Sequence, residues 1–266
     1  MKKKITKIII SIAALIIIIP TIFITIYAIN KYNKRNGIPV LAYHEVVEDN
    51  EKNNYYKNNI WVMDKSHFEE QMKYLADNDF YPLTMKEYSD WKLNNKELPK
   101  KSILITFDDG FKANNIIVKD ILKKYKMKAS IFVETSSLAD SENYEPGILQ
   151  KLSAKELVND EWLEFYTHSH AMHYEDKNGT LLETSNVQTI EEDLKKSSKY
   201  VDINYFAYPY GKGSKQATEA MNHLNVKLGF NISQNYHSTK DNDNFEIPRY
   251  AILSFYNMFI FKYFVN

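Results

Sequence analysis

Two adjacent carboxylates are the first residues of this sequence whose types could do chemistry. Asp108 and Asp109 directly follow the apolar run 102–107 and are followed by Gly110. Carboxylates placed side by side repel each other and are costly to desolvate at the end of a buried strand. A simple turn, which favours Asp and Gly, is the alternative interpretation.

A group of histidines follows a second apolar run. His168, His170 and His173 lie within six residues after the run 163–167, and the whole chain has seven histidines. A solvated loop is the alternative, but two strand ends carrying Asp-Asp and clustered His are better explained by one shared divalent metal. Imidazole and carboxylate ligands together suit zinc or a similar first-row ion.

The elements that must position these residues alternate along the chain. Short, continuous apolar runs predict strands buried on both faces, and amphipathic patterns between them predict helices. This alternation predicts an α/β fold with a parallel barrel, whose reactive side chains lie at the carboxyl ends of the strands. The predicted strands are 39–44, 103–107, 129–133, 163–167, 205–208, 227–231 and 247–252. The predicted helices are 66–78, with Ser66 and Glu69 as a capping box, 115–125, 153–159, 189–200 and 215–225. Residues 135–152 and 174–188 are predicted to be surface loops.

The pentapeptide from Thr106 to Gly110, Thr-Phe-Asp-Asp-Gly, resembles the first motif of a known family letter for letter. That family is the polysaccharide deacetylases, the carbohydrate esterases of family 4 with a NodB homology domain. The resemblance implies a distorted (β/α) barrel and metal-dependent removal of acetyl groups from N-acetylated sugars. It also implies that Asp108 is the general base and that Asp109 binds the metal.

The histidines depart from the family's second motif, His-Ser/Thr-x-x-His. His168-Ser169 matches its beginning, but His173 comes one residue later than the motif requires. This longer spacing resembles the branch of biofilm (intercellular adhesion) deacetylases that act on poly-N-acetylglucosamine. The resemblance implies that His168 and His173 are metal ligands, with His170 as the rival to His173.

The third motif also differs from the usual pattern. Tyr210, between Pro209 and Gly211, corresponds to the residue whose backbone N–H is the implied oxyanion donor. Ala207 stands where most of the family has an arginine. Arg249 follows a predicted strand and is the candidate replacement that orients Asp108; a surface ion pair is the alternative.

The general acid has no counterpart near the end of the chain, because no histidine follows His237. His44 ends the first predicted strand in the sequence Tyr43-His44-Glu45, which resembles an early motif of the same biofilm branch. We therefore expect His44 to protonate the leaving amine. A structural buried histidine is the alternative.

An uncharged, isoleucine-rich run covers residues 8–29 and has lysines on both flanks. About 20 apolar residues suffice for a helix to cross a bilayer, so the run predicts a single transmembrane signal anchor. Four lysines before it outnumber the basic residues after it, which predicts a cytoplasmic tail at 1–7, a linker at 30–36 and an extracellular deacetylase domain at 37–266 in the cell membrane. A cleaved signal peptide and a buried core helix are the alternatives.

Composition excludes several classes of function. The chain has no cysteine, so disulfides and Cys-ligated zinc are ruled out. Seven of its 34 basic residues precede Gly37, which leaves 34 − 7 = 27 basic against 34 acidic residues in the main body. An acidic body of this kind argues against nucleic acid as a partner.

The sequence therefore predicts an enzyme whose partner is an N-acetylated cell-surface polysaccharide. Its expected substrate is the N-acetylglucosamine of poly-β-1,6-N-acetyl-D-glucosamine, and its expected cofactor is a divalent metal, Zn²⁺ before Co²⁺, Ni²⁺ or Fe²⁺. Peptidoglycan is the alternative substrate. A non-catalytic, membrane-tethered glycan-binding protein and a cytoplasmic metal hydrolase are alternatives of other classes.

Overall fold

The computed structural model describes residues 37–234 and 236–266, together with Ile18, Thr21 and Thr25. Apart from those three residues, the predicted anchor 8–29 lies outside the described residues, as do the tail 1–7 and the linker 30–36. Within the described part of the chain, no helix is both long enough and apolar enough to cross a membrane.

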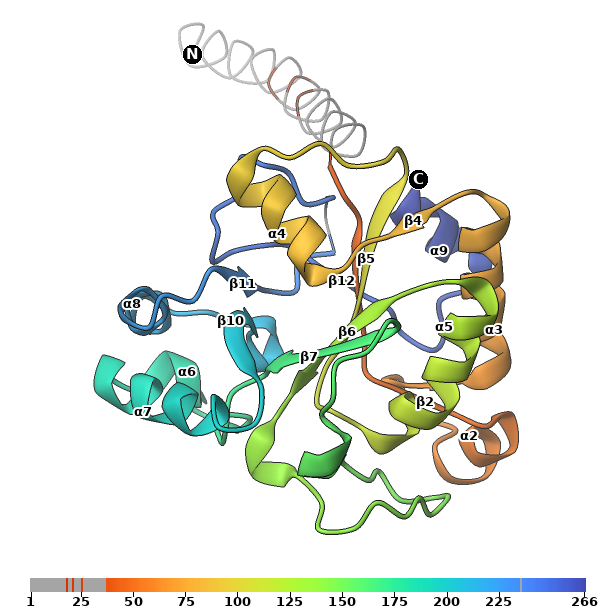
Figure 1. Cartoon of the computed structure of the whole chain (residues 1–266), viewed down its shortest axis with the longest axis horizontal. Helices are drawn as coiled ribbons and strands as arrows, with labels where there is room; N and C mark the ends of the chain where they lie inside the picture. Colours follow the sequence, from red (N-terminus) through yellow and green to blue (C-terminus); the bar gives the residue numbers. More distant parts are fainter. Residues whose placement is uncertain (1–17, 19–20, 22–24, 26–36, 235) are drawn as a thin grey trace, which may run out of the picture.

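Parallel strands form the centre of the molecule (Figure 1). The described residues form an eight-stranded sheet in the order β11-β10-β7-β6-β5-β1-β12, with β4 paired to β5. Its members are β1 (Val40–Tyr43), β4 (Tyr81–Pro82), β5 (Ser102–Phe107), β6 (Ala129–Val133), β7 (Leu163–Thr167), β10 (Asp202–Ala207), β11 (Leu228–Phe230) and β12 (Tyr250–Ala251). The predicted α/β fold of parallel strands is confirmed.

The two edges of this sheet approach each other through one short segment. Ile247 bridges Phe230 of β11 in parallel, and β12, a few residues later, pairs with β1. The sheet therefore curves strongly, as a half-barrel of parallel strands. Its regular pairing is interrupted between β7 and β10, where the register shifts between Asp202 and Phe206.

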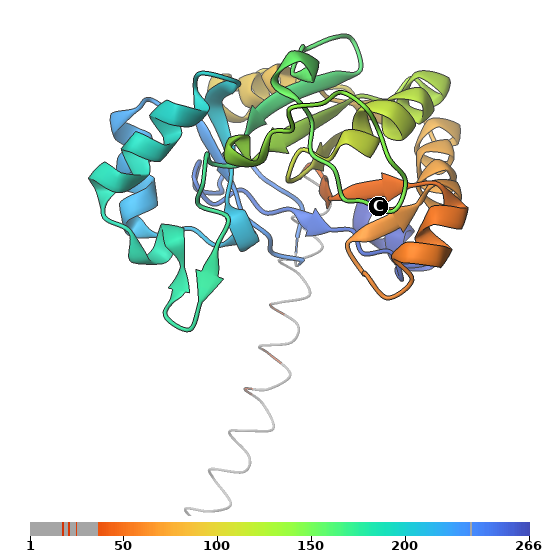
Figure 2. The ribbon, with the colours of Figure 1, turned by 90° about the horizontal axis from the view of Figure 1, so that it is seen from below.

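Helices cover the outside of the curved sheet (Figures 1 and 2). Every residue of β5 and β6 is buried, which explains why both strands are continuous apolar runs. The described helices are α2 (Asp49–Tyr55), α3 (Lys65–Asp77), α4 (Met85–Asn94), α5 (Lys119–Tyr125), α6 (Leu181–Thr184), α7 (Val187–Ser197), α8 (Lys215–His223) and α9 (Met258–Val265). Shorter strands are β2 (Glu45–Val47), β3 (Val62–Asp64), β8 (Glu175–Asp176) and β9 (Gly179–Thr180).

Three local predictions were wrong in detail. The cap of α3 is Asp64, whose side chain accepts the backbone N–H of His67 at 3.0 Å, and Ser66 lies inside the helix. Residues 153–159 form only a 3₁₀ turn at Ala154–Glu156, because the backbone at Leu157 leaves the helical region. The predicted loop 174–188 contains the β8–β9 hairpin and α6.

The helix predicted at 115–125 divides into a π-helical turn, Asn114–Val118, and α5. The Asn114 side chain donates to the His44 carbonyl at 2.6 Å and accepts the Val46 N–H at 3.2 Å. A π turn is often found at functional sites. Here it ties the helix to the bend between β1 and β2.

Candidate metal centre and active site

The turn after β5 sends the two adjacent carboxylates in different directions. Asp109 and Gly110 both have left-handed backbone conformations, with φ of 72° and 73°. A Cβ at Gly110 would lie 2.9 Å from Cγ1 of Val133, so only glycine fits. Asp108 pairs with Arg249, whereas Asp109 lies beside His168 and His173. The different partners reduce the repulsion expected between adjacent carboxylates.

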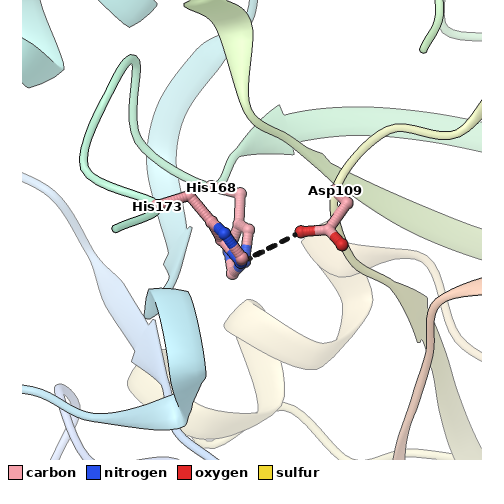
Figure 3. A group of neighbouring side chains, drawn as sticks. All are labelled: Asp109, His168 and His173. Carbon is pink, nitrogen blue, oxygen red and sulfur yellow. Dashed lines mark ion pairs between the residues drawn. The ribbon is translucent and has the colours of Figure 1, made fainter. Parts of the chain in front are cut away.

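Asp109, His168 and His173 converge at the carboxyl ends of β5 and β7 (Figure 3). Oδ1 of Asp109 lies 3.6 Å from Nε2 of His168 and 3.3 Å from Nε2 of His173. One ligand atom from each residue lies within 4.8 Å of the others. Among the described residues, the buried Oδ1 atom has no hydrogen-bond partner.

The protonation of these groups suits a metal. Nδ1 of His168 lies 2.8 Å from the Ala207 carbonyl oxygen, to which it donates, so Nε2 presents its lone pair towards Asp109. Burial lowers the pKa of His168 to about 4, which keeps the imidazole neutral. Burial opposes ionisation of Asp109, but Lys151 and the histidines outweigh it and lower the pKa of this carboxyl. A neutral imidazole at His168 beside an ionised Asp109 is the state in which such residues bind metal, so the residues present fit a divalent ion.

The loop between the two histidines is held by Asp193 of α7. Its carboxylate accepts the backbone N–H of His170 at 2.7 Å and that of Ala171 at 2.8 Å. The His170 side chain points elsewhere, with Nδ1 at 3.0 Å from the Thr135 hydroxyl. The structure therefore brings His173, and not His170, to Asp109.

Arg249 is joined to Asp108 by two hydrogen bonds. Its guanidinium donates to Oδ1 at 2.7 Å and to Oδ2 at 2.8 Å, and it also donates to the Thr106 hydroxyl at 3.1 Å. Only 1% of Arg249 is exposed, so the alternative of a surface ion pair is wrong. Burial alone would raise the pKa of Asp108, but Arg249 and His168 lower it to about 2.

His44 and Tyr210 line the same cavity as the three candidate metal ligands. The His44 ring packs 4.4 Å from Trp61, its Nδ1 has no partner among the described residues, and burial lowers its pKa. The Tyr210 ring stacks on His173 at 4.6 Å. Tyr210 has a φ of 59° in the 3₁₀ turn Pro209–Gly211, which follows β10.

A cavity of about 440 Å³ joins these residues. Six of the seven predicted site residues line it, and Arg249 lies behind Asp108. The cavity is lined by His44, Glu45, Asn59, Trp61, Val62, Asp108, Asp109, Phe111, Leu149, His168, His173, Glu175, Tyr210, Gly211, Lys212 and Ile232. The sequence interpretation missed Glu45 and Trp61. Glu45 adjoins His44 in the same motif, whereas no pattern in the sequence distinguished Trp61.

Comparison with known proteins identifies the family of this chain. The model of the family described as polysaccharide deacetylase matches residues 95–229. A poly-β-1,6-N-acetyl-D-glucosamine N-deacetylase from Staphylococcus aureus is 32% identical over 235 residues, which cover 82% of this chain and 80% of that protein. The chain belongs to the polysaccharide deacetylase family. As a polysaccharide deacetylase, it hydrolyses the amide bond of N-acetyl groups carried by a polysaccharide.

Solved structures share the deacetylase fold. A de-N-acetylase from Aggregatibacter actinomycetemcomitans has a TM-score of 0.71 at 18% identity, with 85% of this chain and 99% of that chain covered. IcaB from Ammonifex degensii has a TM-score of 0.69 at 21% identity, with 86% and 96% covered. Asp108, Asp109, His168, His173 and Tyr210 fall inside the segment matched by the family model, whereas His44 and Arg249 lie outside it.

Proposed function

We propose that this deacetylase removes acetyl groups from N-acetylglucosamine units of poly-β-1,6-N-acetyl-D-glucosamine during biofilm formation. The observation that carries the proposal is the 32% identity to a deacetylase of that name over 80% of its length. The longer spacing between His168 and His173 supports it, since this spacing resembles that of the biofilm deacetylase branch.

Asp109, His168 and His173 would hold the metal, with Zn²⁺ the ion that best suits two imidazoles and a carboxylate. When bound, such an ion would lower the pKa of a water molecule and polarise the acetamide carbonyl. The other residues act on protons and charge. Asp108 is ionised at neutral pH and accepts the proton of the attacking water, while Arg249 fixes its orientation.

The backbone N–H of Tyr210 donates to the oxyanion of the tetrahedral intermediate; loss of such a donor typically costs roughly 10²–10³ in rate. His44 protonates the departing amine. Burial lowers the pKa of His44, which makes its protonated form a stronger donor. The products are acetate and a glucosamine unit.

For the location of the enzyme, we propose that residues 8–29 anchor the chain in the cell membrane, with 1–7 inside and 37–266 outside. The uncharged run and its basic flanks support this arrangement. Protease added to intact cells should degrade the main body. Survival of the main body would mean that it is cytoplasmic.

The substrate is tested by acetate release from two purified polymers, with and without a chelator. The full chain should release acetate from poly-β-1,6-N-acetyl-D-glucosamine, and chelation should stop the release. Release from cell-wall sacculi alone would assign the enzyme to peptidoglycan instead. Binding of the polymer with no acetate from either source would mean a non-catalytic glycan-binding protein.

A further inference from the structure

Glu45, the first residue of β2, is a buried carboxyl group that the reaction does not use. Only 1% of it is exposed, and it lines the same cavity as Asp109 and His173. Its Oε2 atom has no hydrogen-bond partner among the described residues, and none of their Lys, Arg or His nitrogens makes an ion pair with it. A buried carboxyl group with an unpaired oxygen is costly, so a group that enters the cavity and pairs with Glu45 would bind favourably.

A second buried polar atom is also unpaired. The buried hydroxyl of Tyr56 has no partner within the described part of the chain. Burial and then the charge of Glu45 raise the pKa of Tyr56 to about 12. The carboxylate of Glu51, unlike Oε2 of Glu45, is hydrogen-bonded: it accepts the Tyr144 hydroxyl and the Gly147 N–H, both at 2.7 Å.

The charges around Glu45 favour a cation. Burial and then Glu51 raise the pKa of Glu45 to about 8, so a second acidic group contributes to the local field. Lys151 is the cation that opposes them, but its ammonium donates to the Asp109 carbonyl at 3.0 Å and lies 3.8 Å from the centre of the Phe111 ring. An added ammonium group would supply both a positive charge and three donors.

We propose that Glu45 binds the protonated 2-amino group of a glucosamine unit in the active-site cavity. This inference rests on the proposed function, because that reaction turns a neutral acetamide into this cation. A sugar hydroxyl would fit the site less well, since it brings no charge to offset the two carboxylates. Trp61, with 42% of its surface exposed, adjoins Val62, which pairs with Glu45 across β2 and β3. Its indole offers an apolar face at the cavity wall for the sugar ring.

The bound amine can come from either of two sources. It can be the amine just formed, which Glu45 would retain as product, or the amine of an already deacetylated unit next to the one being processed. In both cases the carboxylate distinguishes glucosamine from N-acetylglucosamine by charge.

The test is the affinity of the full chain for glucosamine oligomers and for N-acetylglucosamine oligomers of equal length, measured by calorimetry. Glu45→Gln keeps the shape of the side chain and should weaken binding of the glucosamine oligomer at least tenfold, while binding of the acetylated oligomer changes less than twofold. Glu175→Gln is the matched control. Glu175 lines the same cavity but is already paired with Lys212 at 2.6 Å, so the control should keep its affinity for glucosamine within twofold.

Two results would overturn the inference. Equal weakening for both oligomers would make Glu45 an acceptor for hydroxyl groups, and unchanged affinity for glucosamine would mean that no amine reaches it. Glu45→Asp, which shortens the side chain, gives an independent reading if the Gln variant does not fold, with an expected threefold loss for glucosamine alone. Acetate release by the unmodified chain is measured separately, so failure of the proposed function is distinguished from failure of this site.

The source of the amine is separated with defined oligomers. If it belongs to a neighbouring unit, one acetylated unit flanked by glucosamine should have a KM at least tenfold lower than a fully acetylated oligomer, and Glu45→Gln should remove the difference. If it is the nascent amine, the flanked oligomer shows no advantage, and the substitution raises only the inhibition constant of the deacetylated product.

Discussion

Arg249 and Asp108 form a bidentate ion pair, at 2.7 and 2.8 Å, across 141 positions of the sequence. Both residues are buried, and the arginine comes from the segment between β11 and β12. In most of the family the third motif carries an arginine, but this chain has Ala207 at that position. The guanidinium that pairs with Asp108 therefore comes from a different part of the chain. The planar fork of arginine fixes the carboxylate plane in a way that a lysine could not.

Asp108→Asn should lower the rate of acetate release by roughly 10²–10⁴, the usual contribution of a general base. It should also lower the free energy of unfolding by roughly 3–5 kcal/mol, because it leaves the buried Arg249 without its counter-charge. Urea denaturation and an acetate assay measure the two effects.

The double variant Asp108→Asn/Arg249→Met separates these effects. Removing the orphaned charge should restore at least half of the lost stability, whereas activity should stay at the level of Asp108→Asn. If activity returned with stability, Asp108 would be a structural residue and not the base.

His168→Ala and His173→Ala should each lose bound metal, as determined by elemental analysis of the purified chain. Each substitution removes one of the two imidazole ligands and leaves only one imidazole and the Asp109 carboxylate to hold the ion. His170→Ala is the control and should retain metal, because the ring of His170 forms a hydrogen bond with Thr135. Metal retained by the His173 variant but lost by the His170 variant would show that the loop rearranges when it binds the ion.

Much of the fold could be predicted from the sequence because parallel strands buried on both faces are continuous apolar runs. The strands at 129–133 and 163–167 were predicted to the residue. Helices α2, α4 and α9 were missed, although Thr84 and Glu87 form a capping box that a search of the sequence could have found at α4. The N-cap of α3 was misplaced because Asp64 and Ser66 are both good caps, and only the backbone decides between them.

The convergence of Asp109 with His168 and His173 followed from strand ends in a parallel sheet, which meet at one edge. The direction of each histidine side chain within the loop 168–173 was less predictable. The sequence gives no reason for His170 to turn to Thr135, because Asp193, 23 positions away from His170, sets the path of that loop. The burial of Arg249 and Glu45 likewise depends on packing between distant elements.

Asp193→Ala should weaken metal binding without removing a ligand. Asp193 accepts two backbone N–H groups of the loop that carries the histidines, and without it both donors lose their partner. Loss of a group that supports metal ligands typically costs about 10–100-fold in affinity, which a competition titration with a chromogenic chelator would measure. Asp193→Asn, which keeps one acceptor oxygen, should lose less. Equal affinities for all three chains would mean that the loop is held by other contacts.

Glu45→Gln should make the free protein more stable, and by an amount that grows with pH. The pKa of Glu45 is about 8 in the folded chain against 4.5 for an ordinary glutamate, with burial as the main cause. Between these values the folded state binds more protons than the unfolded state, so stability is full below pH 4.5 and falls as pH rises towards 8. At pH 7 the penalty is at most roughly 3 kcal/mol.

Urea denaturation at pH 5, 6, 7 and 8 tests this. The variant should match the natural chain near pH 5 and exceed it progressively at higher pH, because glutamine has no charge to bury. Glu175→Gln, which removes an exposed and already paired carboxylate, should show no such trend. A difference between Glu45→Gln and the natural chain that stayed constant across the series would mean that Glu45 is ionised at all four values, with a cationic partner inside the folded protein.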